Sequence, residues 1–305
     1  MPFIPRFEPI ERIDWTASTL KPRDLPATVY RALILQIILT TTNGVAAALT
    51  GYDIAKAITR LSIVVNGQDN LIAIPGFHLF YQNYYDFSKE PESTIDTVVG
   101  ASKTQKLTLY LPFSMTRAAS PADTIFDARP PNVTSARLDV LWGSASIGTD
   151  VTVTAGYITP VGWVYESVDS NTQKARHEFT HLQKNLASTG TVDVSLEYGA
   201  YNEYRRLFVY TFNSAGALNN SQIDNLSVKS LSYSWANIPS EILQGLNANQ
   251  YSISPLTGVY IIDLTTDGRM TERLNARSLS ELVLRLNSLV SNGTVEVVSE
   301  KFISA

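Results

Sequence analysis

The sequence contains no cysteine, only three histidines and few charged residues, and each shortage excludes a class of protein. Without cysteine the chain has no disulfide framework, no thiolate metal site and no cysteine nucleophile. Charged residues make up only 17 % of the chain, and the net charge is −4 at pH 7. Lysine and arginine never form a run of three. A chain of this kind carries no global basic field, so we expect no sequence-specific nucleic-acid partner.

We also expect neither a membrane-spanning helix nor a secretory leader. The longest apolar stretch, Ala32–Leu39, is interrupted by Gln36 and falls far short of the ~20 residues that a membrane-spanning helix needs. The first residues, MPFIPRFEPIERIDW, carry three prolines and charges of both signs, unlike a secretory signal. Hydrophobic residues nevertheless make up 44 % of the 305 residues, which is enough for two domains with sizeable cores.

Most of the chain is expected to form β-strands. Residues 30–42 (YRALILQIILTTT) are an apolar, β-branched run that ends at the turn pair Asn43-Gly44, and residues 61–65 lead into a second turn pair, Asn66-Gly67. Apolar and polar residues alternate with a period of two in most other segments. This alternation, with glycine, asparagine, aspartate and serine between the runs, is typical of antiparallel sheets with one buried face.

Two short helices are expected in the connections between strands. Aromatic residues recur at helical spacing over 77–87 after Pro75-Gly76, and Ile242, Leu243 and Leu246 follow Pro239, with Ser240 as a candidate N-cap. The aromatic stripe could serve as a stacking platform for sugars or bases. Helical spacing favours the other interpretation, a face packed in the core.

The most informative feature is an internal repeat. Leu138, Val140 and Trp142 match Leu282, Leu284 and Leu286 at a constant offset of 144, and we expect all six side chains to point into a core. Further matches occur in order along the chain, at offsets that shrink from 170 to 144: Arg6/Arg176, Asn43/Asn213, Leu61/Leu226, Pro75/Pro239, Leu107/Val259 and Val151/Val295. The ordered series predicts two copies of one β-sandwich, with shorter loops in the second copy.

This pattern resembles the double-jelly-roll major capsid proteins of tailless icosahedral viruses, the lineage of tectiviruses, corticoviruses and adenoviruses. The likeness is carried by the segment up to Pro26, the run 30–42, the block 61–76 (LSIVVNGQDNLIAIPG), and their echoes at 206–213 and 226–239. In size the chain is similar to members from membrane-containing bacteriophages. The resemblance implies an all-β fold of two tandem eight-stranded jelly rolls with short helices in connections.

The resemblance also implies a domain division and a set of partners. We expect an extended N-terminal arm at residues 1–25, a first jelly roll at 26–165 and a second at 166–305. The chain would be a structural subunit of the virion capsid shell, without enzymatic activity or cofactors, forming homotrimers whose six sandwiches imitate a hexamer. Its partners would be other copies of itself, penton and minor capsid proteins and an internal viral membrane.

One catalytic motif stands against this interpretation. Residues 177–181 (HEFTH) match H-E-x-x-H, in which two histidines on one face of a helix bind Zn²⁺ and the glutamate acts as general base, with Glu197 or Glu203 as a third ligand. The flanking residues lack the apolar face of a buried helix. The motif also lies inside the repeat, where Arg176 and Glu178 match Arg6 and Glu8. We therefore expect an extended segment, without a catalytic or metal-binding role.

Other signals are weaker. Asp123, Asp127 and Asp150 lie in expected loops but lack the spacing of a calcium-binding loop, and the sequons at Asn132, Asn219, Asn225 and Asn292 are expected to be turns. Two alternatives stay open. A lectin or virion spike would use exposed aromatic residues, with Trp163, Tyr165, Tyr201 and Tyr204 as candidates, and a zinc peptidase would depend on residues 177–181.

Overall fold

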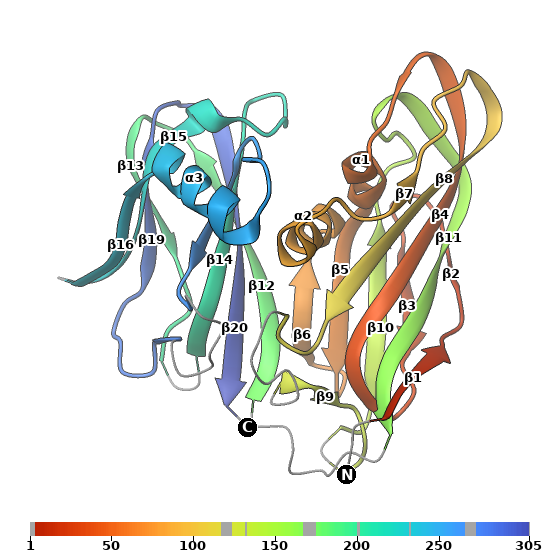
Figure 1. Cartoon of the computed structure of the whole chain (residues 1–305), viewed down its shortest axis with the longest axis horizontal. Helices are drawn as coiled ribbons and strands as arrows, with labels where there is room; N and C mark the ends of the chain where they lie inside the picture. The colour runs from red at the N-terminus through yellow and green to blue at the C-terminus, as the bar shows by residue number, and fades with distance from the viewer. Residues whose placement is uncertain are drawn as a thin grey trace. The chain divides into compact units, whose positions relative to one another are not determined.

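The computed structural model describes residues 4–116, 124–131, 133–166, 175–199, 202–231, 233–265 and 273–304. The chain divides into two compact units, residues 1–177 and residues 178–304, and the strand that crosses this limit is described with the second unit. Each unit is a β-sandwich with a helix after its fifth main strand, and each is described here by itself (Figure 1).

The first unit contains two antiparallel sheets. One has the order β1 (Ile4–Pro9), β11 (Thr149–Glu166), β4 (Val29–Ala48), β8 (Gly100–Pro112) and β7 (Ser93–Thr94), with β2 (Ile13–Asp14) beside β11 and β9 (Phe126–Asp127) beside β4. The other has the order β6 (Asp69–Ile74), β5 (Ile58–Val65), β10 (Ala136–Trp142) and β3 (Leu20–Asp24).

The second unit repeats this arrangement. One sheet has the order β17 (Val259–Asp263), β14 (Asn202–Phe212), β20 (Gly293–Ser304) and β12 (Ala175–Leu186), with β18 (Leu274–Asn275) beside β14. The other has the order β13 (Gly190–Ser195), β19 (Val283–Ser288), β15 (Ile223–Ser230) and β16 (Tyr233–Pro239).

The strand order identifies the fold of both units. The main strands in chain order are β1, β3, β4, β5, β6, β8, β10 and β11 in the first unit, and β12 to β17, β19 and β20 in the second. In either unit the first strand lies beside the eighth, the eighth beside the third and the third beside the sixth, while the other sheet runs fifth, fourth, seventh, second. This is the jelly-roll order, so the expected fold of two eight-stranded jelly rolls is confirmed.

The matched sequence positions fall on equivalent strands. Arg6 and Arg176 lie on the first strand of their units, Leu61 and Leu226 on the fourth, and Val151 and Val295 on the eighth. The six residues expected in the cores are at most 1 % exposed, and Leu282, Leu284 and Leu286 belong to the core cluster of the second unit. The register proposed from the constant offset is therefore confirmed.

The helices are short and lie mainly where they were expected. Helices α2 (Gly76–Phe87) and α3 (Ser240–Tyr251) follow the fifth strand of each unit, and Phe77, Phe80 and Tyr85 of α2 are buried, which confirms the packed face. The expected N-cap of α3 is wrong, because Pro239 holds that position and the Ser240 hydroxyl donates to the carbonyl of Ile223 at 3.2 Å. No helix in the described ranges is long and apolar enough to cross a membrane.

Two features were not predicted. Helix α1 (Gly51–Lys56) begins with a capping box between Thr50 and Asp53. Strand β4 continues through the expected turn at Asn43-Gly44, because Asn43 is buried and its side-chain amide donates to the carbonyl of Asp96 at 2.6 Å. By contrast, Asn66 and Gly67 both have positive φ and join β5 to β6 in the expected hairpin.

The expected N-terminal arm requires correction. In the described part of this segment, β1 pairs with β11 over six residues and β3 pairs with β10 over five. Residues 4–24 are thus the first two main strands of the first jelly roll, where the prolines lie on edge strands that tolerate a missing N–H donor. A domain limit between residues 165 and 166 stays a proposal, because residues 167–174 lie outside the described ranges.

Candidate functional site

The HExxH segment lies on strand β12 and not on a helix. His177 and Phe179 are buried, as expected for alternate residues of a strand. Residues four apart in a strand are separated by ~13 Å along the chain, whereas a shared Zn²⁺ requires both nitrogens within ~2.1 Å of the metal. The backbone of this segment therefore has the wrong geometry for the zinc-protease motif.

The second histidine of the motif has a carboxylate partner on the neighbouring strand. His181 Nε2 lies 2.8 Å from Glu296 Oε2, where Glu296 belongs to β20. Both side chains are partly exposed. This contact fixes His181 against its own sheet.

The glutamates considered as further zinc-site residues are bound to cations. Lys301 Nζ is 1 % exposed, lies 3.2 Å from Glu178 Oε1, and also contacts the carboxylate of Glu197. Asn202 accepts a hydrogen bond from the same ammonium at 3.1 Å. Glu203 is paired instead with two arginines, Arg273 at 2.6 Å and Arg277 at 3.0 Å. Within the described ranges no three acidic or histidine side chains converge as a metal site.

The most deeply buried ionic group in the second unit joins β14 to β20. Glu300 accepts from Arg205 Nη1 at 2.6 Å and from Arg206 Nε, and all three side chains are at most 3 % exposed. Side chains of consecutive strand residues normally point to opposite faces, but a register shift between Tyr204 and Arg206 lets both arginines reach one carboxylate. The guanidinium of Arg206 also lies 4.9 Å from the ring centroid of Phe208.

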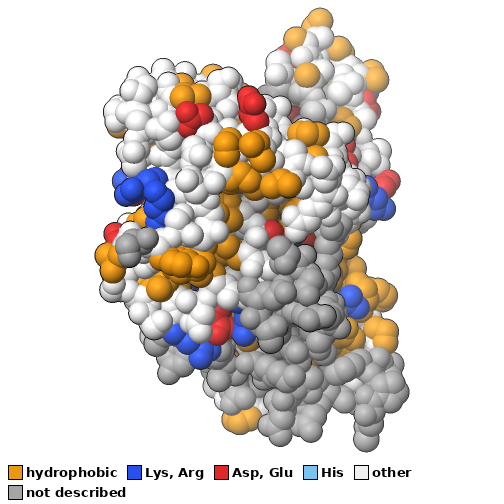
Figure 2. Space-filling model, turned by 60° about the vertical axis from the view of Figure 1, so that its left-hand side comes forward, with side chains coloured by type: hydrophobic (Ala, Val, Ile, Leu, Met, Phe, Trp, Pro, Cys, Tyr) orange, Lys and Arg blue, Asp and Glu red, His pale blue; other side chains and the backbone are white. Residues whose placement is uncertain are grey.

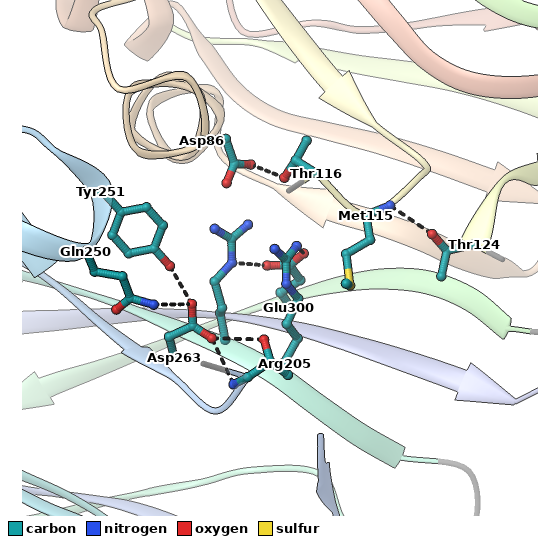
Figure 3. A network of polar contacts seen from close by, with 11 residues as sticks. Asp86, Met115, Thr116, Thr124, Arg205, Gln250, Tyr251, Asp263 and Glu300 are labelled. Atoms are coloured by element: carbon teal, nitrogen blue, oxygen red, sulfur yellow. Dashed lines mark hydrogen bonds and ion pairs between the residues drawn. The ribbon is translucent and has the colours of Figure 1, made fainter. Parts of the chain in front are cut away.

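A second cluster of polar contacts joins helix α3 to strand β17. Asp263 accepts from the Tyr251 hydroxyl at 2.7 Å and from Gln250 at 3.2 Å (Figure 3). Burial raises the pKa of Tyr251, and the neighbouring Arg206 opposes this shift. The phenol therefore remains protonated and acts as the donor. These contacts tie the helix to the sheet.

The remaining candidates in the first unit are also satisfied locally. Asp127 forms a bidentate pair with Arg129 at 2.6 and 2.8 Å, and Asp150 accepts from the backbone N–H of Ala46 at 3.1 Å. Asp123 lies outside the described ranges.

Of the aromatic residues considered for ligand binding, Trp163 and Tyr165 lie on β11 of the first unit and Tyr204 lies on β14 of the second. Tyr204 is buried and donates its hydroxyl to the carbonyl of Glu197 at 2.6 Å, and Tyr201 lies outside the described ranges. Trp163 is half-buried in the first unit, with its ring centroid 5.8 Å from that of Phe7 and 4.1 Å from the Arg31 guanidinium.

Two grooves open on the surface of the second unit. One, of about 920 Å³, lies over β15 and β19 at the start of α3 and has a polar lining that includes Asp224, Lys229 and Arg285. The other, of about 740 Å³, lies between β16, α3 and β17 and is lined mainly by apolar side chains, among them Trp235, Leu243, Leu246 and Ile261. The first suits polar partners, and the second suits the burial of an apolar surface.

Sequence reasoning did not find the buried ionic group of Arg205, Arg206 and Glu300. Its only signal was a pair of arginines inside the apolar run NEYRRLFVYTF. Charged residues in the middle of a buried strand are rarely left unpaired. That rule indicates a partner carboxylate but not which strand carries it.

Comparison with known proteins finds a family model that is similar to the second unit. Residues 177–302 match the model of the viral coat protein P2 C-terminal domain. No match was found among curated proteins.

Solved structures extend the likeness to the whole chain. The STIV major capsid protein superposes with a TM-score of 0.76 and 18 % identity, covering 99 % of this chain and 97 % of that one. The major capsid protein P2 of bacteriophage PM2 gives 0.70 and 12 %, covering 99 % and 98 %, and the PBCV-1 virus capsid gives 0.66 and 8 %, covering 99 % and 94 %. Residues 177–302 are thus similar to the viral coat protein P2 C-terminal domain, and the whole chain has the double-jelly-roll fold that is seen in these viral major capsid proteins.

Proposed function

We propose that the chain is a major capsid protein, the structural subunit of a viral shell, and that it forms pseudo-hexameric homotrimers. The observation that carries the proposal is the presence of two jelly rolls with one strand order in a single chain. Three such chains would supply six similar walls, so one kind of subunit can tile a nearly hexagonal lattice. The coat-protein family of residues 177–302 supports the same role.

An enzymatic role finds no comparable support. The one catalytic motif of the sequence lies on β12, and its glutamate Glu178 forms an ion pair with Lys301. We propose that the ionic groups of the second unit hold strands together and have no catalytic function. Penton proteins, minor capsid proteins and an internal membrane remain the partners proposed for the assembled shell.

The test is the molar mass of the purified chain in solution, followed by electron microscopy under assembly conditions. We expect particles of three 33.6-kDa chains that form hexagonal arrays or closed shells. A chain that stays monomeric at every concentration and never forms a lattice would contradict the proposal.

A further inference from the structure

One lysine of the second unit is buried. Figure 2 shows lysine and arginine side chains at the surface of the molecule, which is their usual place because a charged group is costly to remove from water. Of the lysines in the described part of the chain, Lys301 alone is buried, and its side chain is 1 % exposed. A lysine amine attacks carbonyl carbons once it has lost a proton, so this residue is a candidate nucleophile as well as a cation.

The burial of Lys301 comes from its own sandwich. In the register of β14 and β20, Lys301 lies opposite Tyr204, so the two side chains lie on the same face of the sheet. Tyr204 belongs to the core cluster of the second unit, together with Leu196 and Leu274. The amine therefore faces the interior of this jelly roll, near the place where β14 begins and β20 ends.

The side-chain amide of Asn202 lies directly against this amine. Its Oδ1 accepts a hydrogen bond from Lys301 Nζ at 3.1 Å, and its Nδ2 donates to the carbonyl of Tyr198 at 3.4 Å. The two contacts orient the amide with its carbonyl toward the lysine. Because a C=O bond is only about 1.2 Å long, Cγ lies at most that much farther from the amine than Oδ1 does. The carbonyl carbon of one side chain is thus within reach of the nitrogen of the other.

A shielded carboxylate completes the group. Glu178 Oε1 lies 3.2 Å from Lys301 Nζ, and the Glu178 side chain is 13 % exposed. Leu182, four residues further along β12, packs against the core of the same unit, which places Glu178 on the inner face of its strand. The carboxylate of Glu197 contacts the same ammonium, but its side chain is 55 % exposed and stays in contact with water. Glu178 is therefore the carboxylate that is best placed to exchange a proton with the amine.

We infer that Lys301 and Asn202 are joined by an isopeptide bond that forms within the folded second unit. The site brings together the three groups that this reaction needs, which are an amine, an amide carbonyl and a carboxyl group that carries protons between them. They come from three strands, β20, β14 and β12, that are neighbours in one sheet. The bond links β14 to β20 and replaces an ionic contact with a covalent one.

The atoms of the reaction balance without a further reactant. The Lys301 ammonium gives one proton to Glu178, which removes two opposite charges from a poorly hydrated site. The neutral Nζ attacks Cγ of Asn202 and forms a new C–N bond, while the electron pair of the C=O bond moves to Oδ1. Glu178 then gives its proton to Nδ2 and takes one from Nζ. The carbonyl re-forms, the bond from Cγ to Nδ2 breaks, and Nδ2 leaves as ammonia without any oxidation or reduction.

Position supplies the reactivity that a side-chain amide lacks. Holding two reacting groups in place can be equivalent to an effective concentration of about 10⁵–10⁸ M. The leaving nitrogen is directed toward the carbonyl of Tyr198, a residue that is 50 % exposed, so ammonia has a route to solvent. Its escape makes the step irreversible. The reaction occurs once in each chain and acts on no separate substrate, so it suits a structural subunit.

The mass of the purified full-length chain tests the inference. Bond formation makes the chain lighter by one molecule of ammonia. Trypsin does not cleave after an acylated lysine, so we expect a branched peptide that joins residues 185–205 to residues 286–305. Tandem mass spectrometry then locates the bond between Asn202 and Lys301. Cyclisation of an asparagine that precedes glycine also releases ammonia, but it produces no branched peptide.

Substitutions test the role of each group. Lys301→Met and Asn202→Ala each remove one partner, and both chains should keep the full mass of their sequence. Glu178→Gln preserves the size of the side chain but cannot carry a proton. In newly synthesised chains from a cell-free reaction, it should slow the loss of ammonia by at least about a hundredfold, the lower end of what a positioned acid–base group contributes. Glu296→Gln makes the same replacement elsewhere on β20 and should leave the rate unchanged, with circular dichroism confirming the fold of each variant.

The wild-type chain alone can refute the inference. A folded chain that keeps its full sequence mass, or one that loses ammonia without giving the branched peptide, would overturn it. A branched peptide that forms as fast in Glu178→Gln as in the wild type would overturn the role of Glu178. None of these results affects the proposed capsid role, which depends on the strand order and not on this bond.

Discussion

Replacing Glu300 with glutamine removes the negative charge that two buried arginines share. The carboxylate is fully buried and accepts from Arg205 and Arg206, and Arg206 is its direct cross-strand neighbour in the register of β14 and β20. Glutamine has nearly the same size, so the substitution creates no cavity. It removes the carboxylate charge that both buried guanidinium groups contact.

The expected cost follows from that burial. Removing one partner of a buried ion pair typically costs about 3–5 kcal/mol, because the remaining charge is desolvated and uncompensated. Glu296→Gln is the matched control, since Glu296 lies on the same strand and pairs with the partly exposed His181. A pair with that much solvent contact contributes under about 1 kcal/mol.

Hydrogen exchange measured by mass spectrometry is the suitable assay, because a chain of two units does not unfold in one step. Peptides from β14 and β20 report the free energy of opening of this sheet. We expect Glu300→Gln to lower it by about 3–5 kcal/mol and Glu296→Gln by less than about 1 kcal/mol. Replacing Arg205, Arg206 and Glu300 together by methionine should recover most of the loss, since apolar replacement of a whole ionic group is often neutral. Equal, small effects of the two glutamine variants would refute this reasoning.

Further outcomes are expected elsewhere in the fold. Leu284→Ala removes a fully buried side chain and should cost about 2–5 kcal/mol of unfolding free energy, measured by hydrogen exchange in the second unit. A hydrogen bond from Arg285, its cross-strand neighbour, lowers the pKa of Asp193. The ionised carboxylate therefore stabilises the fold above its unfolded pKa of about 4, and this contribution is lost as the pH falls through the lower pKa of the folded state. The difference in urea midpoint between wild type and Asp193→Asn should accordingly shrink to nothing on acidification. Gly258→Ala should destabilise by about 1–3 kcal/mol, because Gly258 has φ +67° and a Cβ would lie 2.6 Å from a backbone nitrogen. Deleting residues 1–25 removes two strands of the first jelly roll and should abolish its protection from exchange, whereas a free arm would leave it intact.

Periodicity and repetition predicted the jelly rolls because both are local or linear properties of the sequence. The constant offset of 144 placed Val140 and Leu284 on equivalent strands, and alternation placed them in the cores. The same reasoning failed at Asn43-Gly44, where a buried side-chain amide binds a distant loop and the strand continues. A turn signal depends on the local backbone, whereas this strand is maintained by tertiary contacts.

The N-terminal segment was misjudged for a related reason. Prolines and mixed charges reduce local strand propensity, but residues 4–24 pair with strands more than 100 positions away. The burial of Glu300 and Lys301 was equally hidden, because an ionic group is visible in a sequence only when its partners are close in the chain. The resemblance to capsid proteins predicted the fold, whereas the pairing of strands that are distant in the chain required the structure.

The position of the eighth strand has a consequence for synthesis on the ribosome. In both jelly rolls this strand lies inside its sheet, between the first strand and the third, so β20 fills the space between β12 and β14. Residues more than 100 positions apart must therefore meet before the sheet is continuous, which is a slow kind of folding step. A nascent chain that still lacks its eighth strand has no finished sheet to offer a neighbour. If the chain assembles as proposed, this topology would delay association until translation of each jelly roll is complete, and an unfinished subunit would not join its neighbours.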